Sequence, residues 1–174
     1  MVTMDHSVFE TNAQTLRALK DEIDITFVDR DRDETHYRRW SDACQRFHSS
    51  FDRLAFPGGL DQELSLLKSG DLQAVEMAVR YLEADPWFFR SGYIKEELLK
   101  GIKRVTLTED QCERLRAVIL ERINKGSGRE FRRYCRLAKT LITTAFSRQV
   151  REAMMSPDAN ISRRASWVMS SLES

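Results

Sequence analysis

The chain has 174 residues, of which 32% are charged and 41% are hydrophobic. This balance is typical of a folded, water-soluble domain that buries about 70% of its unfolded surface. No stretch approaches the ~18 consecutive apolar residues of a membrane helix, so we expect no membrane partner. Seven glycines and three prolines leave little material for a turn-rich β fold.

Three cysteines, Cys44, Cys112 and Cys135, form an odd and widely spaced set that does not suit a disulfide framework. The first residues, MVTMDHSVFETNAQ, are acidic and polar where a secretory signal has cations followed by an apolar run. These two features predict a protein of the reducing cytoplasm.

The net charge of +1 hides an asymmetry along the chain. Residues 1–85 carry 10 Lys and Arg against 17 Asp and Glu, a balance of −7. Residues 86–174 carry 18 against 10, a balance of +8. Such a separation concerns the partners and association rate of a protein rather than its fold.

Apolar residues at helical spacing predict two long helices in the N-terminal part. The first spans about 7–28, and a charged turn, DRDRDE (29–34), separates it from the second. The second helix carries a stripe at spacings of three and four: Tyr37, Trp40, Cys44, Phe47, Phe51 and Leu54. Such a stripe is a packing seam, and a short connection makes consecutive helices antiparallel neighbours. Residues 1–56 are therefore expected to form a helical hairpin.

Shorter helices are expected after the chain breaks at FPGG (56–59). One ends at Gly70, and Asp71 can cap the next. Asp85 can cap a further helix, with Pro86 at its first position, that runs to about Val105. The remaining helices are expected to start after Thr108, at Gly128, near 144 and after the SPD turn (156–158).

The stretch DPWFFRSGY (85–93) places three aromatic residues at the start of one of these helices. Trp87 is expected to begin a buried stripe that continues at spacings of seven, four and four through Ile94, Leu98 and Ile102. Consecutive helical residues diverge in direction, whereas an aromatic cage needs several rings that face one point. The sequence therefore predicts packing here rather than ligand binding.

The first helices of three hairpins start near 71, 108 and 144, which is the regular spacing of a helical repeat. SGDLQAVEMAVRYLEADP (69–86) and SPDANISRRASWVMSSL (156–172) resemble the first and second helices of a HEAT-type repeat. The resemblance covers about 60–174, but not 1–56. It implies an all-α, right-handed α-α superhelix of antiparallel hairpins, with about three HEAT-like hairpins behind an N-terminal hairpin cap, in a single domain of residues 1–174.

Asp29, Asp31 and Asp33 imitate the opening of a calcium-binding EF-hand loop. That loop needs Gly at its sixth position and Glu at its twelfth, where this sequence has Glu34 and Trp40. A charged turn is the simpler interpretation.

Two other motifs also have simpler interpretations. Cys44 and His48 lie four residues apart, as two metal ligands on one helix can, but no other Cys or His cluster is nearby. KGSGRE (125–130) resembles a phosphate-binding helix start without the full glycine fingerprint. The three histidines all lie in the N-terminal hairpin, and the serines of RRASW (163–167) and SRQVRE (147–152) have no partner base nearby in sequence. We predict no metal, no cofactor, no catalytic residues and no enzymatic activity.

The helix expected from Gly128 carries the most informative polar pattern. At about 100° per residue, five cations occupy an arc of roughly 120° opposite an apolar side: Arg129, Arg132, Arg133, Arg136 and Lys139. Clustered cations repel one another, and an acidic partner protein, a nucleic-acid backbone or an acidic segment of the same chain would relieve this repulsion. These five residues are the candidate partner-binding face, and a solvated or internally paired face is the alternative.

HEAT-like proteins mostly bind proteins or nucleic acids, so the resemblance implies a non-enzymatic binding module. The near-neutral chain favours a protein partner with an acidic surface over nucleic acid, and a dedicated inhibitor such as a toxin-immunity protein is one form of this. The alternatives are a repeat-fold enzyme acting on nucleic acid and a nucleic-acid-binding solenoid. The solenoid would draw further cations from Lys100, Lys103, Arg104, Arg148, Arg151, Arg163 and Arg164.

Overall fold

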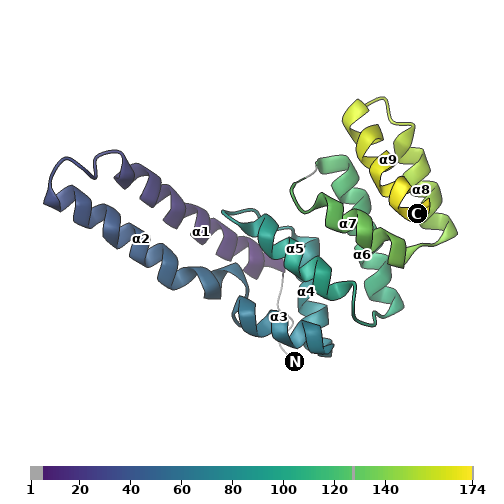
Figure 1. The fold of residues 1–174 in the computed structure, drawn as a ribbon, viewed down its shortest axis with the longest axis horizontal. Helices are drawn as coiled ribbons and strands as arrows, with labels where there is room; N and C mark the ends of the chain where they lie inside the picture. The colour runs from purple at the N-terminus through teal and green to yellow at the C-terminus, as the bar shows by residue number, and fades with distance from the viewer. Residues whose placement is uncertain (1–5, 127, 174) are drawn as a thin grey trace. The chain divides into compact units, whose positions relative to one another are not determined.

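A computed structural model of the protein describes residues 6–126 and 128–173. All regular secondary structure in these residues is helical (Figure 1), which confirms the predicted all-α class. The elements are α1 (His6–Phe27), α2 (Glu34–Ala55), α3 (Leu60–Ser69), α4 (Leu72–Ala84), α5 (Ser91–Ile102), α6 (Glu109–Lys125), α7 (Phe131–Ala138), the 3₁₀ helix η1 (Lys139–Leu141), α8 (Thr144–Met154) and α9 (Ala159–Glu173).

The chain divides into two compact units. Unit 1 comprises Met1–Glu63 with Ala84–Ser91, and unit 2 comprises Leu64–Glu83 with Gly92–Ser174. Unit 1 carries 9 Lys and Arg against 14 Asp and Glu, whereas unit 2 carries 19 against 13. The charge separation therefore follows the units, with −5 on unit 1 and +6 on unit 2. The single domain expected over 1–174 stays a prediction.

Unit 1 is built on the antiparallel hairpin of α1 and α2 (Figure 1). Phe9 and Leu16 of α1 and Phe47 of α2 are buried, because the apolar stripes of the two helices face each other. Asp33 caps α2: its Oδ1 accepts a hydrogen bond of 3.0 Å from the backbone N–H of His36. Hydrogen bonds with His36 lower the pKa of the Asp33 carboxyl, which gives this part of the acidic turn a structural role.

The segment before α5 differs from its prediction. α5 begins at Ser91, six residues after the expected cap at Asp85, and the residues between are not helical. Asp85 and Arg90 have positive φ angles of 46° and 72°, which no right-handed helix contains. Pro86 disfavours the helical region for the residue before it, so a signal expected to start a helix instead begins a turn.

Side-chain contacts of unit 1 hold this turn. The Nη1 of Arg17 donates to the Trp87 carbonyl at 2.6 Å, and the Phe88 N–H donates to the Ser91 hydroxyl at 3.3 Å. Phe88 is buried with its ring centroid 6.2 Å from that of Phe51, while Trp87 is 72% exposed. The expected stripe through Trp87 is therefore wrong, although its other members, Ile94, Leu98 and Ile102, are buried.

Local capping signals in unit 2 are confirmed. The Oδ1 of Asp71 accepts from the N–H groups of Gln73 and Ala74, both at 3.0 Å. Thr108 and Gln111 form a reciprocal capping box at the start of α6. Further along the chain, α9 packs against both α7 and α8, and α7 packs against α6.

Arg114 of α6 joins that helix to α4. Its Nε and Nη2 donate to the two carboxylate oxygens of Glu83 at 2.7 and 2.6 Å, and its Nη1 donates to Glu76 at 3.0 Å. Glu76 also accepts from Arg80 at 2.7 Å and from Gln111 at 3.1 Å. The bidentate pair of Arg114 with Glu83, together with the carboxylate of Glu76 that Arg114 shares with Arg80, fixes the distance and orientation of α4 and α6.

The α6 C-terminus is held by a second arginine, Arg164 of α9. Its side chain is 9% exposed, and its Nε and Nη2 donate to the carbonyls of Ile123 and Asn124 at 2.6 and 3.1 Å. These are among the last carbonyls of α6, which have no partner within the helix. Arg164 is therefore a packing residue that joins α9 to α6.

Acidification is expected to weaken the α4–α6 junction. Burial opposes ionisation of Glu76, but hydrogen bonds from Arg80, Gln111 and Arg114 hold its pKa below the ordinary 4.5. A lowered folded-state pKa gives stability that is present above pH 4.5 and is lost as pH falls through the folded-state value. Glu76→Gln should lower the urea midpoint at pH 6, and the difference from the parent chain should shrink towards pH 3.

The control for this titration is Glu152→Gln, which removes an exposed carboxylate 3.9 Å from Arg148. Exposed pairs contribute little, so this variant should follow the parent chain at every pH. A Glu76→Gln deficit of equal size at pH 6 and pH 3 would contradict the assignment.

Replacing Arg164 should destabilise the fold much more than replacing its exposed neighbour Arg163. Arg164→Met leaves the Ile123 and Asn124 carbonyls without their donor, at an expected cost of about 1–3 kcal/mol in the free energy of unfolding. Arg163→Met should change it by less than about 0.5 kcal/mol. Urea denaturation followed by circular dichroism measures both, and equal losses would refute the packing role.

Candidate binding surface of unit 2

The five predicted cations do not share one helix. α7 begins at Phe131, three residues later than expected, and gives way to the 3₁₀ turn at Lys139. Arg129 therefore precedes the helix, Lys139 follows it, and only Arg132, Arg133 and Arg136 lie on α7. The prediction of a single five-residue helical arc is wrong, since the α-helix covers only the eight residues Phe131–Ala138.

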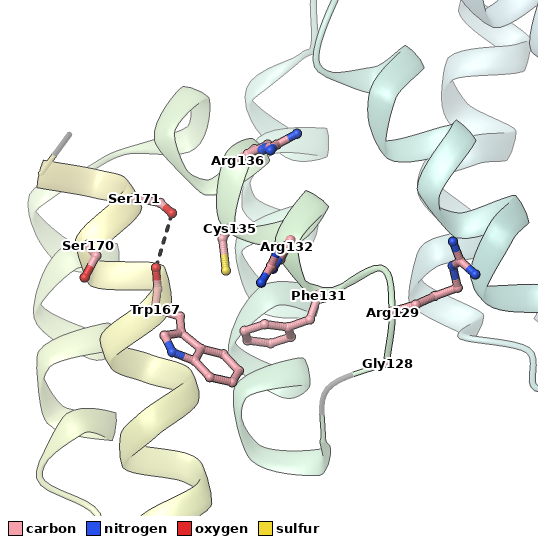
Figure 2. A pocket seen from close by; sticks show the side chains of 9 residues that line it. All are labelled: Gly128, Arg129, Phe131, Arg132, Cys135, Arg136, Trp167, Ser170 and Ser171. Carbon is pink, nitrogen blue, oxygen red and sulfur yellow. Dashed lines mark hydrogen bonds between the residues drawn. The ribbon is translucent and has the colours of Figure 1, made fainter.

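Arg129 is engaged within unit 2. Its guanidinium carbon lies 3.4 Å from the ring centroid of Tyr93, and its Nε lies 3.5 Å from Oε1 of Glu96. Figure 2 shows its side chain pointing away from the other residues drawn. A Cβ added to Gly92 would come within 3.1 Å of the Arg129 side chain, so glycine at this point of α5 permits the approach. The internally paired alternative thus holds for Arg129.

In the described part of the glycine-rich segment, residues 125–126 and 128–130, a carboxylate lies at the start of α7. Glu130 precedes the first residue of α7 and is only 8% exposed. A Cβ added to Gly128 would lie 2.4 Å from a Glu130 carboxylate oxygen, so the carboxylate occupies the space beside that glycine. A negative group at a helix N-terminus satisfies the dipole that would otherwise attract phosphate, and the connecting-turn interpretation is preferred.

The other four predicted cations differ from Arg129. Within 6–126 and 128–173, no carboxylate lies within 4.0 Å of a side-chain nitrogen of Arg132, Arg133, Arg136 or Lys139. All four side chains are exposed or half-buried. Among the described residues, these cations therefore have no ion pair to offset their mutual repulsion.

A hollow of about 590 Å³ lies beside α7 and α9, and we call it the aromatic hollow (Figure 2). Its wall includes Phe131 and Trp167, whose ring centroids are 6.0 Å apart at an interplanar angle of 62°. Phe131 is buried, whereas Trp167 is 48% exposed. The full lining is Gly128, Arg129, Phe131, Arg132, Cys135, Arg136, Trp167, Ser170 and Ser171.

A second hollow of about 230 Å³, the cationic groove, lies between the end of α5 and α7. It is lined by Leu99, Lys100, Lys103, Arg104, Arg133 and Arg136. Lys100 is paired with Glu97, but no described carboxylate lies within 4.0 Å of Lys103 or Arg104. Arg136 lines both hollows, so the two adjoin.

We define the basic surface as the six cations of α7, η1 and the turn after α5 that have no described ion pair: Lys103, Arg104, Arg132, Arg133, Arg136 and Lys139. All of them except Lys139 line one of the two hollows. Sequence reasoning named all six. It did not single out Trp167. The sequence feature that could have pointed to this residue is Arg163, a cation four positions earlier, whose guanidinium lies 5.6 Å from the Trp167 ring centroid.

Cysteine and histidine side chains are the remaining groups that bear on reactivity and metal binding. Burial raises the pKa of the Cys135 thiol to about 11, so the thiol in the aromatic hollow is protonated at neutral pH and is a poor nucleophile. In the part of the chain that the structure describes, no three His, Cys, Asp or Glu side chains are placed to hold a metal ion. His48 is exposed, and its ring lies beside that of Phe47.

None of the helices that the structure describes combines the length and the apolar character that a membrane span requires.

Comparisons of the chain with known protein families, with curated proteins and with solved structures found no match.

Proposed function

We propose that this chain is a non-enzymatic, HEAT-like binding module whose unit 2 engages an anionic macromolecule through the basic surface. The observation that carries the proposal is the group of six cations, contributed by α7, η1 and the turn after α5, that have no ion pair among the described residues. A folded chain that retains such a group unpaired gains electrostatically when an anionic surface covers it.

The spacing of the helices supports the repeat part of the proposal. α4, α6 and α8 begin at residues 72, 109 and 144, at intervals of 37 and 35 residues. Consecutive elements pack together in two of the expected pairs, α6 with α7 and α8 with α9. A right-handed superhelix of such pairs would present one side of each hairpin to a partner.

The contrast among the arginines supports the binding part. Arg114 and Arg164 are held by carboxylates and carbonyls inside unit 2, whereas Arg133 and Arg136 face a groove. Arginine and tryptophan are the residues most often found at the energetic centre of interfaces, and the basic surface adjoins the half-exposed Trp167.

The sequence favours an acidic protein as this partner because the whole chain is nearly neutral. The division into units weakens that preference, since the acidic residues concentrate in unit 1 while unit 2 has a balance of +6. An acidic protein, including the target of a dedicated inhibitor, and a nucleic acid both meet the requirement for regular negative charge.

Charge reversal in the cationic groove tests the proposal. Arg133→Glu/Arg136→Glu should weaken binding of a fluorescent polyanion at least tenfold in about 50 mM salt, because each substitution replaces attraction by repulsion. The probes are a 20-residue poly-L-glutamate and a 20-nucleotide oligo(dT), measured by fluorescence anisotropy.

The matched control is Arg148→Glu/Arg151→Glu on α8, which makes the same change in net charge at exposed positions outside both hollows. The affinity of this variant for each probe should stay within about twofold to threefold of the affinity of the parent chain. If neither probe binds the parent chain, or if the two double variants lose equal affinity, the basic surface is not the binding site.

A further inference from the structure

We propose that the anionic partner is a single-stranded nucleic acid, with phosphates in the cationic groove and a base against Trp167 in the aromatic hollow. This inference rests on the proposed function and specifies the chemistry of its partner. It draws on the junction of two unlike hollows at Arg136. A single strand offers the same two chemistries side by side, since each nucleotide joins a charged phosphate to a flat, stacking base.

The cationic groove suits phosphate better than an apolar ligand. Five of its six lining residues are cations, and Leu99 is the sixth. Three of the five, Arg104, Arg133 and Arg136, are arginines, whose planar guanidinium groups bind phosphate oxygens in pairs. None of the lining residues is acidic, so a phosphate there would meet no carboxylate of the lining itself.

The aromatic hollow suits a base better than a second phosphate. Its volume of about 590 Å³ falls in the range of small-molecule sites, and Trp167 offers a half-exposed indole braced at its side by Phe131. The Ser170 hydroxyl donates to the backbone carbonyl of Ser166 at 2.9 Å. A hydroxyl oxygen that donates in this way keeps lone pairs that can accept from the edge of a base.

Cations also border the aromatic ring. Figure 2 shows Arg132 beside Phe131 and Cys135 on α7, across from Trp167 on α9. The guanidinium of Arg163, one helical turn before Trp167 on α9, lies 5.6 Å from the Trp167 ring centroid. A base stacked on the indole would therefore have guanidinium groups within reach of its flanking phosphates.

The arrangement favours a single strand over a duplex. Bases of a duplex are stacked inside it and cannot enter a hollow without being flipped out, which costs a few kcal/mol. A single strand presents its bases already unstacked or easily unstacked. An acidic protein would supply negative charge to the groove, whereas a single strand supplies both this charge and, in every nucleotide, a flat base that can stack on the Trp167 indole.

Binding assays with four fluorescent probes test the inference: oligo(dT) and oligo(rU) of 20 nucleotides, a blunt 20-base-pair DNA duplex, and poly-L-glutamate of 20 residues. We expect the parent chain to bind at least one single strand more than fivefold more tightly than the duplex and poly-L-glutamate. For about four phosphate contacts, the logarithm of the binding constant should fall with the logarithm of salt concentration at a slope near −3.

Trp167 separates this inference from simple charge attraction. Trp167→Leu should weaken binding of the single strand about 5- to 150-fold, the range for loss of one stacked base, with little change in the salt slope. Arg133→Glu/Arg136→Glu should make the slope shallower by roughly 1.4. Trp87→Leu, which removes the 72% exposed tryptophan of unit 1, is the matched control and should bind like the parent chain.

A second readout guards against a folding defect in Trp167→Leu. Binding should quench tryptophan fluorescence, and the quenching should disappear in Trp167→Phe but persist in Trp87→Phe, with thermal unfolding unchanged in both. Tight binding in Trp167→Leu, or quenching that persists in Trp167→Phe, would refute the stacking site.

The outcomes separate the two proposals. Binding of poly-L-glutamate without binding of either single strand would overturn the nucleic-acid inference and leave the proposed function standing with a protein partner. A preference for the duplex would also overturn it. Failure of every probe at about 50 mM salt would overturn both, and single-strand binding that Arg133→Glu/Arg136→Glu leaves unchanged would move the site away from the basic surface.

Discussion

The burial of one side of α7 decides where the charges of unit 2 lie. Five of its eight residues are buried: Phe131, Tyr134, Cys135, Leu137 and Ala138. They pack towards α6 and α9, and the three other positions, all arginines, are thereby directed to the surface and its hollows. Apolar burial supplies the main favourable free energy of folding, so the arginines keep these positions even though they repel one another.

The arginines of unit 2 have different structural roles. Arg164 completes the hydrogen bonds of a neighbouring helix end, and Arg114 holds two helices through a pair of carboxylates. Arg129 rests on Tyr93, while Arg133 and Arg136 face a groove. A buried guanidinium without hydrogen-bond partners costs free energy, whereas water solvates an exposed one. The packing arginines therefore differ from those of the basic surface both in exposure and in having partners within the chain.

Local sequence signals were reliable where no distant contact competed with them. The caps at Asp71 and Thr108 occur as predicted, because a short polar side chain can bond the free N–H groups of its own helix start. The cap expected at Asp85 fails, because Phe88 is buried near Phe51 and Arg17 binds the Trp87 carbonyl. Contacts 37 and 70 residues away in sequence thus outweigh a local preference of about 1 kcal/mol.

The all-α class, the α1–α2 hairpin and the six cations of the basic surface could be predicted before folding was considered, because helical periodicity and charge can be read along the chain. Contacts between distant segments were needed to show that Arg129 is paired internally, that Trp87 is exposed while Phe88 is buried, and that Trp167 lies beside the arginines of α7. Trp167 follows Arg132 by 35 positions. Only the packing of α9 on α7 brings the two together, and periodicity within single helices carries no information about which helices pack.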